Sequence, residues 1–289
     1  MHSFLFVPGD RPERFAKAQA AGAHVVILDL EDAVAPQAKN AAREACSDWL
    51  ASGRQALLRI NGSDTRWHAD DLALLLLPGL RGVMLPKAED PDAVAAIAAL
   101  LPHDALLVPL LETTEGIWNA REIARVPGVH RLAFGSVDFQ LDAGIEGDDD
   151  ALLYARSRLV LASRLGRLAS PLDGVTLATG DAAALAADVA RARRLGFGGK
   201  LCIHPSQVVA VNEGFAPAEH ELRWAAEVAA AAMTQKGAFL LRGKMVDSPV
   251  IDRAHRLLAM VPQPVIAHST ALDADQIRTT RQTPPKGTR

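Results

Sequence analysis

The chain alternates short, nearly uninterrupted apolar runs with longer stretches in which apolar residues recur at helical spacing. Runs of the first kind are typical of strands that are buried on both faces, as in a parallel sheet. Eight such runs occur, at 4–9, 24–30, 55–60, 82–87, 105–112, 130–136, 170–176 and 199–204. The alanine-rich segments between them predict helices, at 13–21, 37–51, 67–77, 91–100, 115–125, 151–167, 181–195 and 205–213. This order predicts an α/β fold.

The number of strand–helix units distinguishes two parallel architectures. Eight units match a (β/α)8 TIM barrel, which usually takes about 250 residues. The alternative is a doubly wound open sheet, which carries a G-x-G-x-x-G turn after its first strand. This chain has VPGDRPER at that place instead. We therefore expect a barrel, formed by residues 1–214.

The segment after the barrel predicts a smaller appendage. A candidate hinge, a helix, a turn and a short helix follow one another, at 213–221, 219–235, 239–249 and 250–260. An appendage of about 45 residues is too small to bury a core of its own. We therefore expect residues 215–262 to form a helical lid that packs on the barrel or on a neighbouring subunit. Residues 263–289 are polar, and we expect this tail to be disordered.

Composition and charge exclude several classes of function. The chain of 289 residues is 49% hydrophobic and has a net charge of −3, so it lacks the basic balance of proteins that bind nucleic acid or a membrane surface. Its two cysteines, Cys46 and Cys202, are too few for a disulfide scaffold and favour a cytoplasmic location. We expect neither a signal peptide nor a membrane-spanning helix.

Two acids follow neighbouring predicted strands, at the end that forms the active-site face of a barrel. Glu112 follows PLL and Asp138 follows AFGSV. If the two carboxylates converge, they repel each other unless a cation neutralises them, and Mg²⁺ prefers such oxygen ligands. The chain has no His/Cys cluster that would favour zinc. The alternative is that Glu112, through ETTEG, and Asp138 cap the helices that follow them, since acids are common in first turns.

Other polar residues at strand ends leave two interpretations open. Arg59, in LLRING, either pairs with Asp29 or Glu31 of the adjacent strand or holds a substrate carboxylate or oxyanion. For Asp29, Glu31 and Asp32 three roles stay open: an acid at a helix N-terminus, a partner of an active-site group, or a ligand of a water molecule. Lys87 either binds an anion or extends into solvent.

Three cations, Arg11, Arg14 and Lys17, follow the first strand. They indicate either a phosphate-bearing ligand or a solvated helix face. His204 precedes a proline, and we expect it to begin a helix rather than to take part in catalysis. Ser136 ends the sixth predicted strand.

Several segments, taken in order, resemble a known family. They are FLFVPGDRPERFAKA, VILDLEDAV, LLRING, GVMLPKAED, PLLETTEG, LAFGSVDF, GKLCIHPSQV and GKMVDSPV. They follow one another as in the citrate lyase beta-subunit-like (CitE-like) family of the HpcH/HpaI aldolase superfamily, which includes malyl-CoA and citramalyl-CoA lyases. The resemblance extends to about residue 260.

The resemblance implies a TIM barrel with a C-terminal helical lid, a homotrimer or hexamer, and reversible, Mg²⁺-dependent cleavage of a carbon–carbon bond in a 3-hydroxyacyl thioester of CoA. By matching position, Glu112 and Asp138 would bind Mg²⁺, or Mn²⁺ in its place. Arg59 would stabilise the thioester enolate oxygen. Asp247, in GKMVDSP, would be the general acid/base and would come from the lid of a neighbouring subunit.

The same resemblance assigns roles to the remaining polar residues. Arg11, Arg14 and Lys17 would lie near the CoA phosphates. Five residues would contact the substrate or support the groups that contact it: Asp29, Glu31, Asp32, Lys87 and Ser136.

One departure from the family pattern concerns the lid. Many relatives have DGKMVD where this chain has LLRGKMVD, so Arg242 precedes Gly243. The change alters the charge near the lid turn, and we expect it to affect ligand preference. Two further activities stay open, namely a thioesterase that acts on the same substrates and a subunit of a citrate lyase complex that acts on an acyl-carrier protein.

Overall fold

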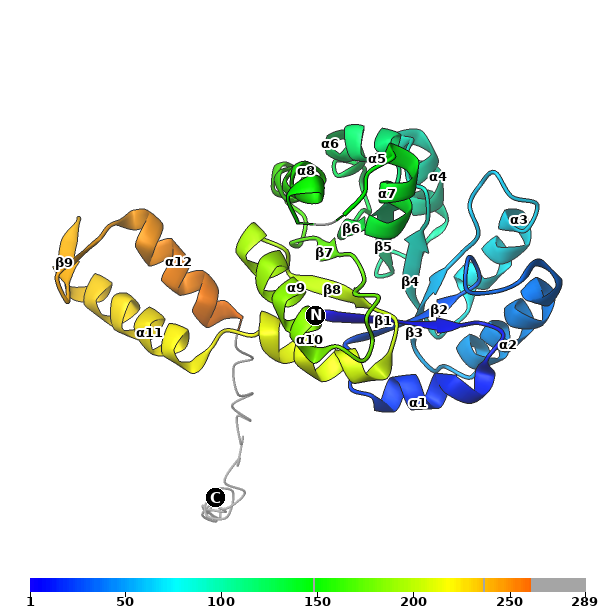
Figure 1. The fold of residues 1–289 in the computed structure, drawn as a ribbon, viewed down its shortest axis with the longest axis horizontal. Helices are drawn as coiled ribbons and strands as arrows, with labels where there is room; N and C mark the ends of the chain where they lie inside the picture. The colour runs from blue at the N-terminus through cyan, green and yellow to red at the C-terminus, as the bar shows by residue number, and fades with distance from the viewer. Residues whose placement is uncertain (148, 236, 261–289) are drawn as a thin grey trace, which may run out of the picture. The chain divides into compact units, whose positions relative to one another are not determined.

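The computed structural model describes residues 1–147, 149–235 and 237–260. Residues Met1–Ala216 form one compact unit, a closed barrel of eight parallel strands in the order of the sequence (Figure 1). The strands are β1 (Ser3–Pro8), β2 (Val25–Asp29), β3 (Ala56–Arg59), β4 (Leu80–Leu85), β5 (Leu106–Leu111), β6 (Ala133–Phe134), β7 (Leu172–Asp173) and β8 (Gly199–Cys202). The predicted TIM barrel is therefore confirmed, and the open sheet is excluded because β8 pairs with β1.

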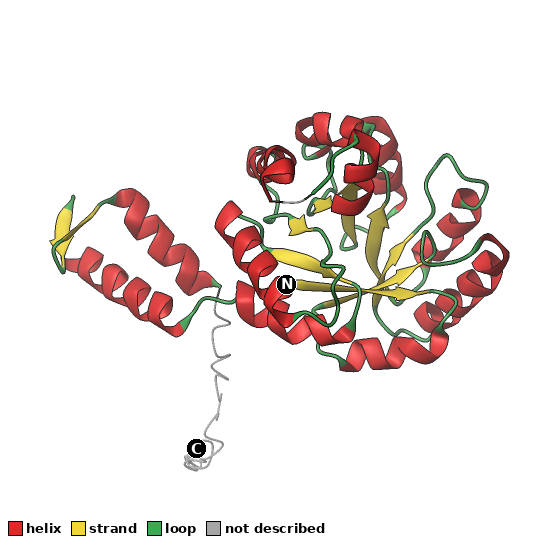
Figure 2. Cartoon of the chain, viewed as in Figure 1, coloured by secondary structure: helices red, strands yellow, loops and turns green. Residues whose placement is uncertain are grey.

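Helices surround the strands on the outside of the barrel (Figure 2). They are α1 (Phe15–Ala20), α2 (Lys39–Ala51), α3 (His68–Asp71), α4 (Pro91–Leu100), α5 (Thr114–Trp118), α6 (Ala120–Ile123), α7 (Ser136–Ala143), α8 (Leu153–Leu165), α9 (Ala182–Leu195) and α10 (Val208–Phe215). Short 3₁₀ turns occur at Pro12–Arg14, Pro36–Ala38, Leu72–Leu76, Asp149–Leu152 and Pro205–Gln207. No helix in the described part of the chain is long and apolar enough to cross a membrane.

The sequence patterns missed one helix. We expected the helix after the sixth strand to begin at 151, but α7 already begins at Ser136 and ends at Gly144, which has a left-handed φ of 64°. Strand β6 is correspondingly only two residues long. The apolar residues of AFGSVDF match a strand as well as a helix start, because a short apolar run does not distinguish the two.

Alternation along the strands separates two layers of the barrel core. Residues of one parity fill the interior, among them Ile27, Leu57 and Leu110. Residues of the other parity, such as Leu28 and Leu58, pack against the surrounding helices. Side chains two positions apart on a strand lie on the same face. The side chain two positions after the last interior residue of β2, β3 or β5 therefore lies at the inner C-terminal end of the barrel, which we call the mouth.

The described residues from Pro217 to Met260 form a second compact unit. It consists of α11 (Glu219–Thr234), a hairpin of β9 (Phe239–Leu241) and β10 (Lys244–Val246), and α12 (Ser248–Ala259). The predicted turn at 239–249 is thus a hairpin and the start of a helix. The expectation that this segment buries no core of its own is wrong, because four of its residues are buried together: Ala225, Val228, Val246 and Ala254. The expected disorder of residues 263–289 lies outside the described residues.

Candidate active site

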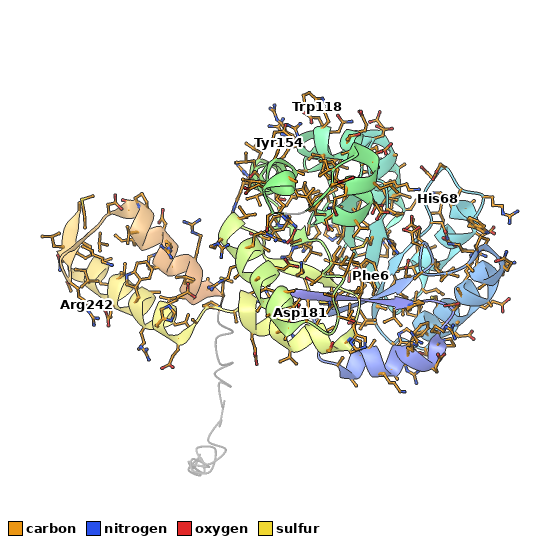
Figure 3. The ribbon with its side chains drawn as sticks, in the orientation of Figure 1. Phe6, His68, Trp118, Tyr154, Asp181 and Arg242 are labelled. Carbon is orange, nitrogen blue, oxygen red and sulfur yellow. The ribbon has the colours of Figure 1, made fainter. Side chains whose placement is uncertain are left out.

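Arg59 is the central cation of the mouth. It follows Leu57 by two positions on β3, and its guanidinium donates two hydrogen bonds to Asp29 of β2, from Nε at 2.7 Å and from Nη2 at 2.6 Å. Its Nη1 lies 2.9 Å from Glu31 Oε2, and the guanidinium lies 4.7 Å from the ring centroid of Phe6 on β1 (Phe6 is labelled in Figure 3). Burial opposes the charge of Arg59, but attraction by Asp29, Glu31 and Asp32 outweighs it and raises the pKa of Arg59. The predicted pairing of Arg59 with Asp29 and Glu31 is confirmed.

Asp29 orients both Arg59 and the loop after β2. Its Oδ1 also accepts a hydrogen bond from the Glu31 backbone at 2.9 Å, and its Oδ2 accepts one from Ala33 at 3.2 Å. Glu31 is buried beside Asp29, and Asp32 is exposed 3.8 Å from the Arg59 guanidinium. Desolvation raises the pKa of Glu31 to about 7, against the opposing attraction of Arg59.

Glu112 continues the interior row of β5 and is buried at the mouth. The Lys87 backbone N–H donates to its Oε1 at 2.8 Å, whereas its Oε2 has no hydrogen-bond partner among the described residues. Desolvation, followed by repulsion from Glu31, raises the pKa of Glu112 to about 8. Glu112 is not the cap of the next helix, because the Thr113 side chain caps α5. The capping interpretation of Glu112 is therefore wrong.

Asp138 lies in the first turn of α7, but Gly135 is the N-cap of this helix and no side chain caps it, so the capping interpretation of Asp138 is wrong as well. Its side chain is exposed, but the concave mouth removes part of the surrounding water, and this desolvation, with the charge of Asp32, raises the pKa of Asp138. A cavity of about 60 Å³ brings Asp138 together with Arg59, Glu112 and Ser136. The structure thus places the two predicted metal ligands and the predicted catalytic arginine at one site.

Gly135 makes room for this arrangement. A Cβ atom at this position would lie 2.6 Å from Glu112 Oε2, closer than real Cβ atoms approach a neighbour. The sequence reasoning missed Gly135, although a glycine between a predicted strand and an acid is a signal of close approach. It also missed Phe6, whose place beneath the guanidinium follows from the alternation of β1.

Lys87 contacts Glu112 through its backbone N–H rather than through its side chain. The residue has a left-handed φ of 44°, which is unusual for a side chain other than glycine, and this conformation accompanies the hydrogen bond to Glu112. Its side chain is exposed, as the solvent interpretation predicted.

Lys39 is a buried cation that the sequence analysis did not identify. Its Nζ donates to the backbone oxygens of Leu30 and Glu31, at 2.7 Å and 2.8 Å, and to Asn61 Oδ1 at 2.7 Å. Asn61 is held in turn by Asp71. Lys39 therefore fixes the loop that carries Glu31. Nothing in its sequence context, the start of an amphipathic helix, distinguishes it from a solvated lysine.

Two other strand-end residues have structural roles. Asp173 is fully buried and accepts from Arg156 Nε at 3.0 Å. His204 begins the turn before α10, where its ring accepts from the Ser206 backbone in a capping box, as predicted.

The remaining predicted residues lie outside the mouth cavity. Arg11, Arg14 and Lys17 are exposed on the turn and helix that follow β1. Asp247 belongs to the second unit, where it is half-buried and caps α12 by accepting from the Val250 backbone at 3.4 Å. The described residues contain no group of three or more His, Cys, Asp or Glu side chains placed to hold a metal by themselves. A cation held by Glu112 and Asp138 would have two carboxylate ligands, which suits Mg²⁺ with waters or substrate oxygens in the other positions.

Comparison with known proteins finds relatives over most of the chain. A family described as HpcH/HpaI aldolase/citrate lyase matches residues 2–205. The citrate lyase subunit beta-like protein of Deinococcus radiodurans is 39% identical over 276 residues, covering 90% of this chain and 96% of its own length. A (3S)-malyl-CoA thioesterase of Cereibacter sphaeroides is 34% identical and covers 89% and 93% of the two chains.

One solved structure is similar to this protein over most of the chain. It is the crystal structure of the protein CitE from Mycobacterium tuberculosis in complex with magnesium, acetoacetate and coenzyme A. It matches with a TM-score of 0.79 at 38% sequence identity, and the match covers 90% of this chain and 97% of the other.

Proposed function

Because the chain belongs to the HpcH/HpaI aldolase/citrate lyase family, we propose that it is a Mg²⁺-dependent carbon–carbon lyase. The proposed substrate is a 3-hydroxy-dicarboxylic acyl-CoA such as malyl-CoA or citramalyl-CoA, which is cleaved reversibly to an acyl-CoA and a 2-oxoacid. The observation that carries this proposal is that Arg59, Glu112 and Asp138 line the same cavity.

The residues of the mouth fit a divalent cation. Glu112 Oε2 is buried without a hydrogen-bond partner in the described chain, and burial raises the pKa of this carboxyl to about 8. A cation held by Glu112 and Asp138 reverses that effect, because a nearby positive charge favours the ionised carboxylate. When bound, Mg²⁺ supplies a Lewis acid for the carboxylate and carbonyl oxygens of the oxoacid. The magnesium in the complex of the mycobacterial relative supports this assignment.

Arg59 stabilises the negative charge that develops on the thioester oxygen. Cleavage converts the 3-hydroxyl group, which loses its proton, into the carbonyl of the 2-oxoacid, and it leaves the electron pair of the broken carbon–carbon bond on the acyl-CoA fragment as an enolate. A guanidinium that Asp29 and Glu31 already orient needs little reorganisation as this charge grows, and such preorganised donors contribute strongly to catalysis.

Asp247 is the general acid/base in this proposal: it accepts the proton that the 3-hydroxyl group loses and returns it to the enolate carbon. The C-terminal unit acts as a lid that brings Asp247 to the mouth of a neighbouring subunit in a homotrimer or hexamer. A closing lid also excludes water from the enolate. Arg11, Arg14 and Lys17, exposed after β1, lie near the CoA phosphates, and Asp29, Glu31, Asp32, Lys87 and Ser136 surround the reacting end.

A thioesterase is the second candidate function. Relatives from Cereibacter sphaeroides with that name are 34% and 32% identical to this chain. Hydrolysis of the same bound thioester needs only an activated water in addition to the residues above. Its product is free CoA, whereas the lyase produces an acyl-CoA.

The deciding experiment incubates the purified protein with Mg²⁺ and malyl-, methylmalyl-, citramalyl- or citryl-CoA and identifies the products by mass spectrometry. We expect an acyl-CoA and an oxoacid from at least one substrate, and loss of this activity with EDTA and in Asp138→Ala. The matched control is Asp142→Ala, which removes another exposed acid of the same helix that bonds only to Thr114 in the described structure.

Each other result has a clear meaning. Free CoA as the product, without an oxoacid, would replace the lyase by the thioesterase. Full activity in EDTA or in Asp138→Ala would contradict the metal assignment. Inactivity on every CoA thioester would contradict the proposal and favour a subunit of a citrate lyase complex.

A further inference from the structure

The C-terminal unit encloses a second cavity, of about 620 Å³, made only of its own residues. One face of α11 lines it with residues at helical spacing: His220, Arg223, Trp224 and Glu227. The hairpin and α12 supply the opposite wall. This volume lies in the range typical of cavities that hold small ligands.

The lining of this cavity is strongly basic. Arg223, Arg242, Lys244 and Arg253 face it, together with a single carboxylate, Glu227. Two of these cations are already paired: Arg242, whose Nη2 lies 2.7 Å from Glu227 Oε1, and Arg223, which pairs with Glu219 on the same helix. Lys244 and Arg253 have no carboxylate within 4.0 Å in the described part of the chain. Cations gathered around a hollow repel one another, and an anionic ligand relieves that repulsion.

Arg242 is presented at a strained backbone position. Arg242 and Gly243 connect β9 to β10 with φ angles of 51° and 74° (Arg242 is labelled in Figure 3). A two-residue hairpin turn with both φ angles positive favours Asn, Asp or Gly at its first position. Arginine disfavours this conformation, and strain of this kind is characteristic of functional positions.

Trp224 adds a flat surface beside the cations. The Arg253 guanidinium lies 5.3 Å from its ring centroid. An indole next to several guanidinium groups suits a ligand that combines a planar base with phosphates, because aromatic rings stack on bases and arginine matches phosphate geometry.

We propose that this cavity binds a phosphorylated nucleotide, with its phosphates on Arg242, Lys244 and Arg253 and its base against Trp224. None of these residues lines the mouth cavity of the barrel, and the proposed cleavage assigns no role to any of them. A free nucleotide and the nucleotide end of a CoA thioester share this chemistry, and the experiment separates the two sources.

The test measures binding to the full-length protein by isothermal titration calorimetry, without acyl substrate or metal, using pyrophosphate, ATP and CoA as separate probes. We expect pyrophosphate to bind, and ATP or CoA to bind more tightly. The tighter of these two probes identifies the source of the ligand. Adenosine without phosphate is expected to bind at least about 10-fold more weakly, because the charge-assisted contacts are absent.

The central variant is Arg242→Asn, because asparagine suits the turn that arginine strains. We expect its melting temperature to stay equal or rise while its affinity for pyrophosphate falls about 10-fold, the effect of losing one charge-assisted contact. Lys244→Gln should weaken binding similarly. The matched control, Arg256→Gln, removes an exposed arginine of α12 that does not line the cavity, and it should leave affinity unchanged.

Three results would overturn the proposal. The first is no heat of binding with millimolar pyrophosphate or ATP. The second is equal affinity in the wild type, Arg242→Asn and Lys244→Gln. The third is loss of pyrophosphate binding in the triple variant of Arg11, Arg14 and Lys17 to Gln, with no loss in Arg242→Asn, since this would assign the binding to the barrel. Because no turnover is measured, these results do not depend on the proposed lyase activity.

Discussion

Lys39 and Arg59 are two buried cations that organise the mouth in different ways. Arg59 pairs with the carboxylates of Asp29 and Glu31, so its positive charge is balanced within the site. Lys39 instead donates to two backbone oxygens and one amide oxygen, and its pKa is lowered by desolvation. Arg59 is therefore the cation to which the proposed function assigns the chemistry, whereas Lys39 holds the loop that carries Glu31.

Replacement of Lys39 by methionine should destabilise the barrel. Methionine keeps the aliphatic part but removes the donor from three acceptors, of which Glu31 O also accepts from the Val34 N–H, and the free energy of unfolding is expected to fall by about 3 kcal/mol. Urea denaturation followed by circular dichroism measures this change. Lys17→Met, at an exposed position of α1, is the control and should be nearly neutral; equal stability of the two variants would contradict the role of Lys39.

A histidine pair at the start of β1 and β2 should make stability depend on pH. The rings of His2 and His24 lie 5.4 Å apart, and His2 Nδ1 lies 2.8 Å from the Gly198 carbonyl oxygen. Desolvation lowers the pKa of both rings below the ordinary value of 6.5. Below that value the unfolded chain binds more protons than the folded one, so this contribution to stability is complete above pH 6.5 and is lost as the pH falls.

The measurement compares melting temperatures of the wild type and of the double variant His2→Gln/His24→Gln between about pH 7.5 and about pH 5. The wild type should lose stability relative to the double variant toward acid pH. Subtracting the variant removes the contribution of Glu31 and Glu112, whose raised pKa values act in the opposite direction. A difference that does not change with pH would rule out the histidine pair.

At the scale of elements, the junction between β6 and α7 positions the site. The strand ends after two residues, and the helix begins at once, so Asp138 comes within the first helical turn beside the mouth. Gly135 at the junction lets the Glu112 side chain pass. The geometry of the two proposed ligands therefore depends on the packing of β5 against this junction.

Gly135→Ala should separate the effects on activity and on folding. The added Cβ forces Glu112 aside, which is expected to lower kcat of the proposed lyase at least about 10-fold and to cost about 1–3 kcal/mol of stability. Steady-state kinetics and thermal melts measure the two effects. Gly180→Ala is the matched control, because a Cβ there has no neighbour within 4 Å and the backbone needs no positive φ. Full activity of Gly135→Ala would show that Glu112 has room to move without loss of function.

At the scale of the whole molecule, the chain consists of two compact units, Met1–Ala216 and the segment from Pro217 onward. The proposed lyase needs Glu112 from the first unit and Asp247 from the second. If the lid serves a neighbouring subunit, one active site combines residues of two chains.

Mixed oligomers test this sharing of sites. Glu112→Gln and Asp247→Asn are each expected to be inactive alone. Random mixing of their subunits restores about one quarter of the sites if each site combines Glu112 of one subunit with Asp247 of another. Co-expression with two affinity tags, followed by the lyase assay, measures the recovery. No recovery in confirmed mixed oligomers would place Asp247 at the mouth of its own chain or outside the site.

The amino-acid sequence by itself determined the barrel and the polar residues at its strand ends. Eight apolar runs with helices between them have few other ways to bury their hydrophobic faces, and alternation along β2, β3 and β5 assigns Asp29, Arg59 and Glu112 to the inner face. Only the tertiary structure decided the roles of Lys39, Gly135 and the hairpin around Arg242. Their surroundings come from segments distant in the chain or from a turn conformation, and local residue patterns do not encode contacts between such segments.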